Sequence, residues 1–205
     1  MHPEDIDRYP DRATTRVNLS NGQTACLRPL SAYNGDILGE YFLGLSKTTR
    51  GFYGPHPFDQ ATADNICRAF RHAETLRMLA TIEQDGQEHI VAYFLVFFGI
   101  LDGDRPRYDK LGIALDQDTD CTLAPSVADA YQNTGVGSLV MTHLISVLHR
   151  CGRKRVVLWG GVQERNERGI SNRRRKHGSL LTSHTDTKGA RTRLNERDLA
   201  RLLLQ

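Results

Sequence analysis

The sequence predicts a single mixed α/β domain in which helices flank a central sheet. Short apolar runs that fit strands alternate with longer runs that have the 3.6-residue period of an amphipathic helix. A glycine-rich stretch joins one such strand, Cys121 to Ala128, to one such helix, Val136 to Arg150. The chain has 205 residues, of which 39% are hydrophobic, and this is enough to bury one core.

The N-terminal half is expected to begin with a flexible polar segment, residues 1–16. Three strands follow from apolar runs bounded by turn residues: Thr24 to Leu30, Leu76 to Glu83 and His89 to Ile100. Asn34 is expected to cap a helix over Asp36 to Leu45. Either Asp59 or Thr62 caps a second helix that ends near His72, and the Gly-, Pro- and aromatic-rich stretch between the two helices is predicted to be a loop.

The second half continues the alternation. A polar insertion separates the central strand from Cys121, and Gly152 is typical of a residue that ends a helix. Arg155 to Trp159 is predicted to be a short strand, and Asn166 to Lys176 a further helix. The order is that of a mixed domain with one glycine loop at the end of a strand.

Charge is spread unevenly, although the net charge is only +3. Between Arg150 and Arg193 there are 13 basic residues and three acidic ones. A basic surface attracts nucleic acid and equally attracts small phosphorylated ligands. The absence of interleaved aromatic residues or a recognised motif disfavours nucleic acid as a partner.

The four cysteines are widely spaced and form no CxxC pair, which disfavours a disulfide framework or a zinc site. They are Cys26, Cys67, Cys121 and Cys151. No apolar run is long enough to span a membrane, and the first residues lack a signal-peptide pattern. We therefore expect a cytoplasmic protein that binds neither metal nor membrane.

The glycine stretch predicts an anion site. A helix start has unpaired N–H groups and the positive end of the helix dipole, and glycines let the backbone close around a phosphate. Gly137-Ser138-Leu139 lacks the lysine of a mononucleotide loop, which disfavours a kinase or NTPase. Three classes of phosphate ligand compete for such a loop: mononucleotides, dinucleotides and coenzyme A. The third glycine of a dinucleotide fingerprint is also missing, which disfavours that class. Coenzyme A is the third class.

Here the sequence resembles the GCN5-related N-acetyltransferase (GNAT) superfamily. The family signature is Arg or Gln, two residues, Gly, one residue, then Gly or Ala, and Gln132 to Gly137 matches it without a gap. Arg153 to Val162 stands where the family's next strand belongs, and Asn166 to Ile170 resembles the start of its next helix. The resemblance covers residues 24–170 and implies a mixed, mostly antiparallel central sheet.

The resemblance also implies contacts with acetyl-CoA as co-substrate. The pyrophosphate would accept N–H bonds from the signature, and the pantetheine arm would pair like a strand with the end of the preceding strand, where an N–H near Val127 would polarise the thioester. Asn166 would reach the coenzyme through its amide. The implied cofactor residues are Pro125, Ser126, Val127, Gln132, Asn133, Thr134, Gly135, Val136, Gly137, Ser138 and Asn166.

Three positions where family members carry an acid or base are not matched. Arg173 stands where many members have a tyrosine, and Gly161 and Thr122 stand where others have a glutamate. The catalytic residues are therefore unknown. The substitutes, each with a plain structural alternative, are Asp129 (or a turn), His56 (or a rigid loop), Tyr93 (or a core aromatic), Cys121 (or a buried strand residue) and His143 (or helix packing).

The C-terminus departs further from the family. Residues 17–178 are assigned to the acetyltransferase-like domain and 179–205 to a polar, basic tail. Ser183 to Arg193 has almost no apolar residue, so the family's final strands are expected to be missing or degenerate. The leucines of Leu194 to Leu204 suit a short amphipathic helix.

These observations favour an N-acetyltransferase that transfers the acetyl group to a primary amine by direct attack. The acceptor is a small amine or a protein lysine or N-terminus. Two alternatives stay open: a non-catalytic acyl-CoA-binding or sensing domain, motivated by the unmatched positions, and a basic nucleic-acid-binding module, motivated by Arg173 to Lys176. A homodimer is compatible with the sequence, which does not fix the oligomeric state.

Overall fold

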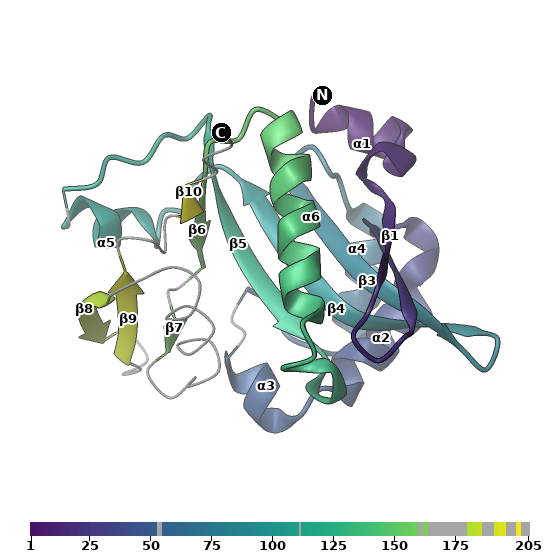
Figure 1. Cartoon of the computed structure of the whole chain (residues 1–205). Helices are drawn as coiled ribbons and strands as arrows, with labels where there is room; N and C mark the ends of the chain where they lie inside the picture. Colours follow the sequence, from purple (N-terminus) through teal and green to yellow (C-terminus); the bar gives the residue numbers. More distant parts are fainter. Residues whose placement is uncertain are drawn as a thin grey trace. The chain divides into compact units, whose positions relative to one another are not determined.

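The computed structural model describes residues 1–52, 55–110 and 112–159, together with the backbone of short strands at 162–163, 180–185, 191–195 and 200–201 (Figure 1). The chain forms two compact units. The first unit contains Met1–Phe97 and Ala124–Gly152, and the second contains Phe98–Leu123 and Arg153–Gln205.

Four antiparallel strands in sequence order form the sheet of the first unit: β1 (Thr15–Asn18), β2 (Thr24–Pro29), β3 (Thr75–Gln84) and β4 (Gln87–Phe98). The tip of the β3–β4 hairpin is Asp85-Gly86, where φ is 54° and 75°. Two successive residues with positive φ match the right-handed twist of the paired strands. The predicted strands of this half, and the turn between the last two, are therefore confirmed.

Helices cover both faces of this sheet: α6 (Val136–Arg150) lies on the near face in Figure 1, and α2 (Gly35–Gly44) and α4 (Gln60–Ala69) lie on the far face. Helix α6 has the predicted bounds, and it buries an apolar stripe that includes Val140, Leu144 and Leu148. Asp59 caps α4 by accepting a hydrogen bond from the Thr62 amide at 2.7 Å. Asn34 precedes α2 as expected, but its side chain bonds Ser31 and does not cap the helix.

Two segments of the first unit differ from the prediction. Residues 1–16, expected to be flexible, contain α1 (Glu4–Arg8), the 3-10 helix η1 (Pro10–Ala13) and the start of β1. Ile6 and Ala13 are fully buried there. The loop predicted after α2 contains α3 (Lys47–Phe52), which has no buried residue and therefore gives no periodic signal. A further 3-10 turn, η2 (Ala32–Asn34), precedes α2.

In the second unit, the first half of β5 (Asp120–Val127) pairs in parallel with β6 (Arg155–Leu158). With the antiparallel pairs of the first unit, this gives the mixed, mostly antiparallel strand pairing that was predicted. Ile100, Tyr108 and Val157 form a small core, against which Ile113 and Leu115 pack. The predicted polar insertion contains α5 (Arg105–Asp109). Pro106 is compatible with this helix because it stands in the first turn, where a missing N–H costs no helical bond.

The C-terminal segment also contains strands. β9 (Arg191–Asn195) pairs antiparallel with both β7 (Val162–Gln163) and β8 (Leu180–Thr185), and β10 (Ala200–Arg201) pairs with β6. The predicted helix over Leu194 to Leu204 is therefore wrong at the described residues of that stretch. The expectation of missing or degenerate final strands is met by β7 and β10, which have two residues each, but β8 has six residues and β9 five. The helix predicted over Asn166 to Lys176 lies outside the described residues.

Candidate functional site

The glycine loop reverses the chain between β5 and α6 with two residues in the left-handed region. Asn133 has φ 66°, and Gly135, which precedes the first residue of α6, has φ 91°. Thr134 Oγ1 closes the turn by donating to the carbonyl of Tyr131 at 2.7 Å. Glycine tolerates positive φ without a steric penalty, so the first glycine of the signature is explained by its backbone conformation.

The start of α6 presents main-chain N–H groups. Ser138 and Leu139 donate the first helical bonds, both to the carbonyl of Gly135, at 3.0 and 3.1 Å. Within the part of the chain that the structure describes, the amides of Gly135, Val136 and Gly137 donate to no protein acceptor. These amides, with the positive end of the helix dipole behind them, can bind an anion such as a phosphate.

The second signature glycine is explained by a close approach. A Cβ at Gly137 would lie 3.3 Å from Cγ2 of Val127, at the end of β5. At Gly135, by contrast, a Cβ would meet none of the described residues within 4 Å. Helix α6 therefore begins directly against the strand end that the resemblance assigns to the pantetheine arm.

The end of β5 presents one edge away from β4. The amide of Ala128 donates to Val91 of β4 at 2.9 Å, and because N–H groups alternate along a strand, the Val127 amide points to the opposite edge. Gln132 Nε2 donates to the Val127 carbonyl at 3.1 Å and to Thr49 Oγ1 at 3.2 Å. The first residue of the signature thus fixes the loop to the strand end.

Asp129 holds the loop from one side. Its carboxylate accepts hydrogen bonds from the Ser46 amide and hydroxyl, both at 2.9 Å, and from the Thr49 hydroxyl at 2.7 Å. Partial burial raises the pKa of Asp129, but these bonds outweigh it and leave the pKa below its ordinary value. The turn alternative is therefore the better description of Asp129, in the 3-10 turn η3 (Asp129–Tyr131).

The β1–β2 turn holds the loop from another side, which sequence reasoning did not foresee. Ser20 Oγ donates to the carbonyl of Thr134 at 2.9 Å, and the Tyr131 hydroxyl donates to Gln23 Oε1 at 3.4 Å. Ser20 and Thr134 are 114 residues apart in sequence, so only the fold brings them together.

Beside β5, on the α2 side of the sheet, lies an aromatic cluster of Phe42, His56, Phe58 and Tyr93. The ring centroids of Phe42 lie 5.3 Å from His56, 4.6 Å from Phe58 and 5.5 Å from Tyr93. The ring centroid of Tyr41 lies 6.1 Å from that of Phe42, and the Tyr41 hydroxyl bonds Ser126 Oγ at 2.9 Å. Burial raises the pKa of Tyr41 far above its ordinary value, so this phenol stays neutral.

His143, Cys121 and Thr122 each make contacts that fit a structural role. His143 Nε2 bonds the carbonyl of Ala13 at 2.8 Å on the packed face of α6. Cys121 is buried, with Sγ 3.5 Å from the Arg155 carbonyl. Thr122 is fully buried and donates to the Gly99 carbonyl at 3.3 Å, so this position offers no base. Asn166, Gly161 and Arg173 to Lys176 lie outside the described residues.

Among the described residues, no group of three or more His, Cys, Asp or Glu side chains could hold a metal ion. The same part of the chain has no helix that is both long enough and apolar enough to cross a membrane.

No protein-family model and no curated protein matches the sequence, but solved structures match the fold. The GNAT domain of PAT from S. lividans has a TM-score of 0.64 at 21% identity, over 91% of this chain and 99% of that one. A GNAT-family acetyltransferase from Streptococcus pneumoniae has a TM-score of 0.56 at 15% identity, over 82% and 95%. YncA from Salmonella typhimurium, solved with its cofactor acetyl-CoA, has 0.53 at 14%, over 82% and 89%.

These likenesses show that the chain has the fold of the GNAT superfamily. The resemblance that the glycine signature gave is thus confirmed at the level of fold.

Proposed function

We propose that the protein is an N-acetyltransferase that transfers the acetyl group of acetyl-CoA to a primary amine. The observation that carries the proposal is the row of amides at Gly135, Val136 and Gly137, which have no acceptor among the described residues and adjoin Val127. Charge-assisted bonds from backbone amides are the interactions that a pyrophosphate requires. The GNAT fold, and a neighbour solved with acetyl-CoA, support this choice of ligand.

In the proposed complex the loop residues from Asn133 to Ser138 bind the pyrophosphate through their backbone. The pantetheine arm adds as a strand along Pro125, Ser126 and Val127, on the edge to which the Val127 amide points. That amide would donate to the thioester carbonyl, where negative charge develops during attack by the amine. Asn166 remains an expected contact from the sequence alone.

Calorimetric titration of acetyl-CoA into the full chain and its Gly135→Val variant tests the site. The variant is expected to raise the Kd at least 100-fold, because a β-branched residue cannot keep φ near 91° and the amides turn away. A wild-type protein that fails to bind acetyl-CoA would contradict the proposal, as would a variant that binds it normally.

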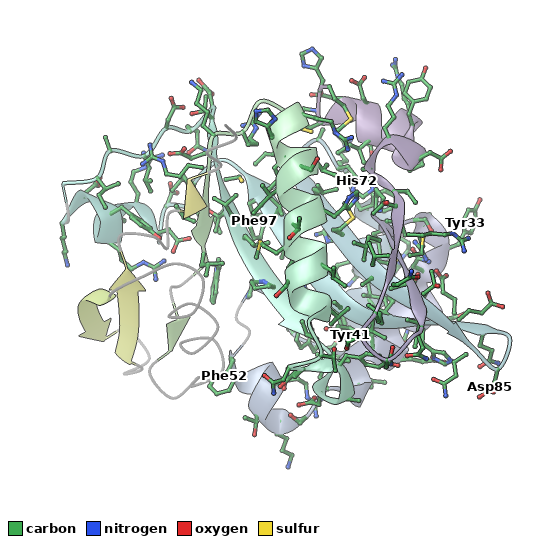
Figure 2. All side chains as sticks on the ribbon, viewed as in Figure 1. Tyr33, Tyr41, Phe52, His72, Asp85 and Phe97 are labelled. Atoms are coloured by element: carbon green, nitrogen blue, oxygen red, sulfur yellow. The ribbon has the colours of Figure 1, made fainter. Side chains whose placement is uncertain are left out.

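Gly86→Val is the matched control. Gly86 has φ 75°, and its added Cβ would have no described atom within 4 Å, so it shares the backbone strain and the open surroundings of Gly135. It lies at the β3–β4 tip next to Asp85, far from the loop (Figure 2). Each substitution is expected to cost about 1–3 kcal/mol of stability, but only Gly135→Val should lose the ligand.

The alternative function is a non-catalytic acyl-CoA sensor, which Thr122 favours because its hydroxyl is bonded to Gly99 and it cannot replace a glutamate. Release of free thiol from acetyl-CoA in the presence of amines distinguishes the two functions. A thermal-shift panel of acetyl-CoA, CoA, ATP and NAD identifies the ligand class first, because a ligand that binds only the native state raises the Tm.

A further inference from the structure

His56 has a defined tautomer. Its Nδ1 lies 2.8 Å from the carbonyl oxygen of Pro57, and its Nε2 lies 3.1 Å from the Tyr93 hydroxyl. A carbonyl oxygen can only accept, so in the neutral ring Nδ1 carries the proton and Nε2 accepts from the Tyr93 O–H. The pair is thus poised to move a proton from the phenol to the imidazole.

The surroundings keep this imidazole neutral and fixed. The rings of Phe42, Phe58 and Tyr93 lie within 5.7 Å of its centroid. Burial lowers the pKa of His56, the bond to Pro57 raises it, the charge of Arg77 on β3 lowers it and Asp59 before α4 raises it; the sum is a pKa below the ordinary value. His56 is half-buried and Tyr93 fully buried, so the neutral base is present at physiological pH.

The pair is connected to the strand that would hold the thioester. Tyr93 lies on β4, and the ring of Tyr41 lies 6.5 Å from its ring. The Tyr41 hydroxyl in turn bonds Ser126 Oγ at the end of β5. The polar atoms of Tyr93 and Ser126 therefore lie on the same side of the first unit, and the charge of Asp129 also acts on the Tyr41 hydroxyl.

We propose that Tyr93 and His56 form a proton-transfer dyad for the acceptor amine, in which Tyr93 Oη takes the proton of the reacting nitrogen and His56 is the base behind it. Because Tyr93 is fully buried in the free protein, the amine reaches its hydroxyl only after the surrounding side chains move. This inference rests on the proposed acetyltransferase function and assigns the step for which the family's own positions are unmatched.

The acceptor enters as an ammonium. An N–H bond breaks and its proton passes to Tyr93 Oη, while the phenol proton passes to His56 Nε2. The neutral amine attacks the thioester carbon, the N–C bond forms and the C–S bond breaks with its electron pair on sulfur. The thiolate takes a proton from Tyr93, which the imidazolium resupplies, and the nitrogen loses a second proton to water and keeps the third as the amide N–H.

Thiol release from acetyl-CoA, measured against pH with a lysine peptide, a peptide with a free N-terminus and spermidine, tests the dyad. His56→Gln and Tyr93→Phe are each expected to lose about 100-fold or more in kcat/KM. The double variant should be no worse than either single one, because the two groups act as a unit. The acetyl-CoA Kd should stay within twofold.

The pH profile separates a chemical role from a structural one. The wild-type rate should rise with pH through the lowered pKa of His56, since only the neutral ring accepts a proton, and this limb should vanish in both variants. His143→Gln is the matched control, because His143 is also half-buried with one ring nitrogen on a carbonyl, yet it packs on α6. It should keep both rate and limb.

Three results would overturn the dyad: a limb that persists in His56→Gln, additive losses in the double variant, or no thiol release with any of the three amines although acetyl-CoA binds. Failure of the wild-type protein to bind acetyl-CoA would refute the proposed function itself and is a separate readout. If His56→Gln does not fold, Tyr93→Phe, which removes one oxygen atom, decides the test by its pH profile.

Discussion

The glycine loop, residues 128–138, and the aromatic cluster of Phe42, His56, Phe58 and Tyr93 are built in opposite ways. In the loop, the groups expected to bind are main-chain amides, and side chains such as Asp129 and Ser20 only hold the backbone in place. In the cluster, the groups expected to act are the side chains themselves, and packed rings hold them.

This difference predicts how each region tolerates substitution. A loop that binds through its backbone should survive most side-chain changes and fail when a dihedral angle or a close approach is violated. A cluster that acts through side chains should be sensitive at each of its members, both in stability and in activity. The two regions can therefore be separated experimentally.

The largest effect is expected at Phe42, which is fully buried and contacts four aromatic rings. Phe42→Ala should cost about 3–5 kcal/mol, because it removes a large apolar surface and leaves a cavity. Urea unfolding followed by fluorescence measures the loss. A cost below about 1 kcal/mol would show that the rings do not form a packed core.

Tyr41→Phe should have a smaller effect. It removes one hydroxyl and leaves Ser126 Oγ buried without that partner, at a cost of about 1–2 kcal/mol. The raised pKa of Tyr41 adds a spectroscopic check: ultraviolet titration of the variant should show one tyrosine fewer that stays neutral beyond the ordinary range.

Asp129→Asn should change stability by about 1 kcal/mol or less, because the carboxylate is exposed to solvent. The folded-state pKa lies below the unfolded value, so the carboxylate contributes stability above about pH 4, and this contribution disappears as pH falls through the folded pKa. Urea midpoints between pH 6 and pH 2.5 should fall less in the variant. An identical slope in both proteins would contradict the hydrogen-bonded role.

The smallest effect is expected for Ser20→Ala, which removes one exposed bond to the Thr134 carbonyl. Stability should change by a few tenths of a kcal/mol, and calorimetry should give an acetyl-CoA Kd within twofold of wild type. A tenfold higher Kd would mean that the β1–β2 turn sets the loop geometry. Ligand binding by the loop would then depend on a side chain as well as on the backbone, as expected for the aromatic cluster.

Elements long enough to show a hydrophobic period could be predicted from the sequence, whereas short elements could not. Helix α6 has 15 residues and a wide apolar stripe, so its bounds could be predicted. Helices α1, α3 and α5 have five or six residues and at most one buried side chain each, which leaves no period to detect. In the C-terminal segment, leucine spacing indicated a helix, but β10 pairs with β6, as tertiary pairing can override local pattern.

The candidate site likewise has one part that the sequence predicted and one part that it did not. The signature from Gln132 to Gly137 located the loop, because glycines directly before an amphipathic run indicate a tight turn at the start of a helix. The bonds that hold the loop join residues 83 and 114 positions apart, and no local pattern encodes them. The contact between His56 and Tyr93 likewise spans 37 positions, and the sequence alone left both residues with ordinary structural explanations.

The two signature glycines are expected to differ in the substitutions that they tolerate during evolution. Gly135 is required by a dihedral angle, and no change elsewhere relieves that requirement. Gly137 is required only by the 3.3 Å separation from Val127, so a lineage in which Val127 shrinks to alanine gains room for a methyl group there. Searches for divergent relatives should therefore hold the first position strictly as glycine and treat positions 127 and 137 as a covarying pair.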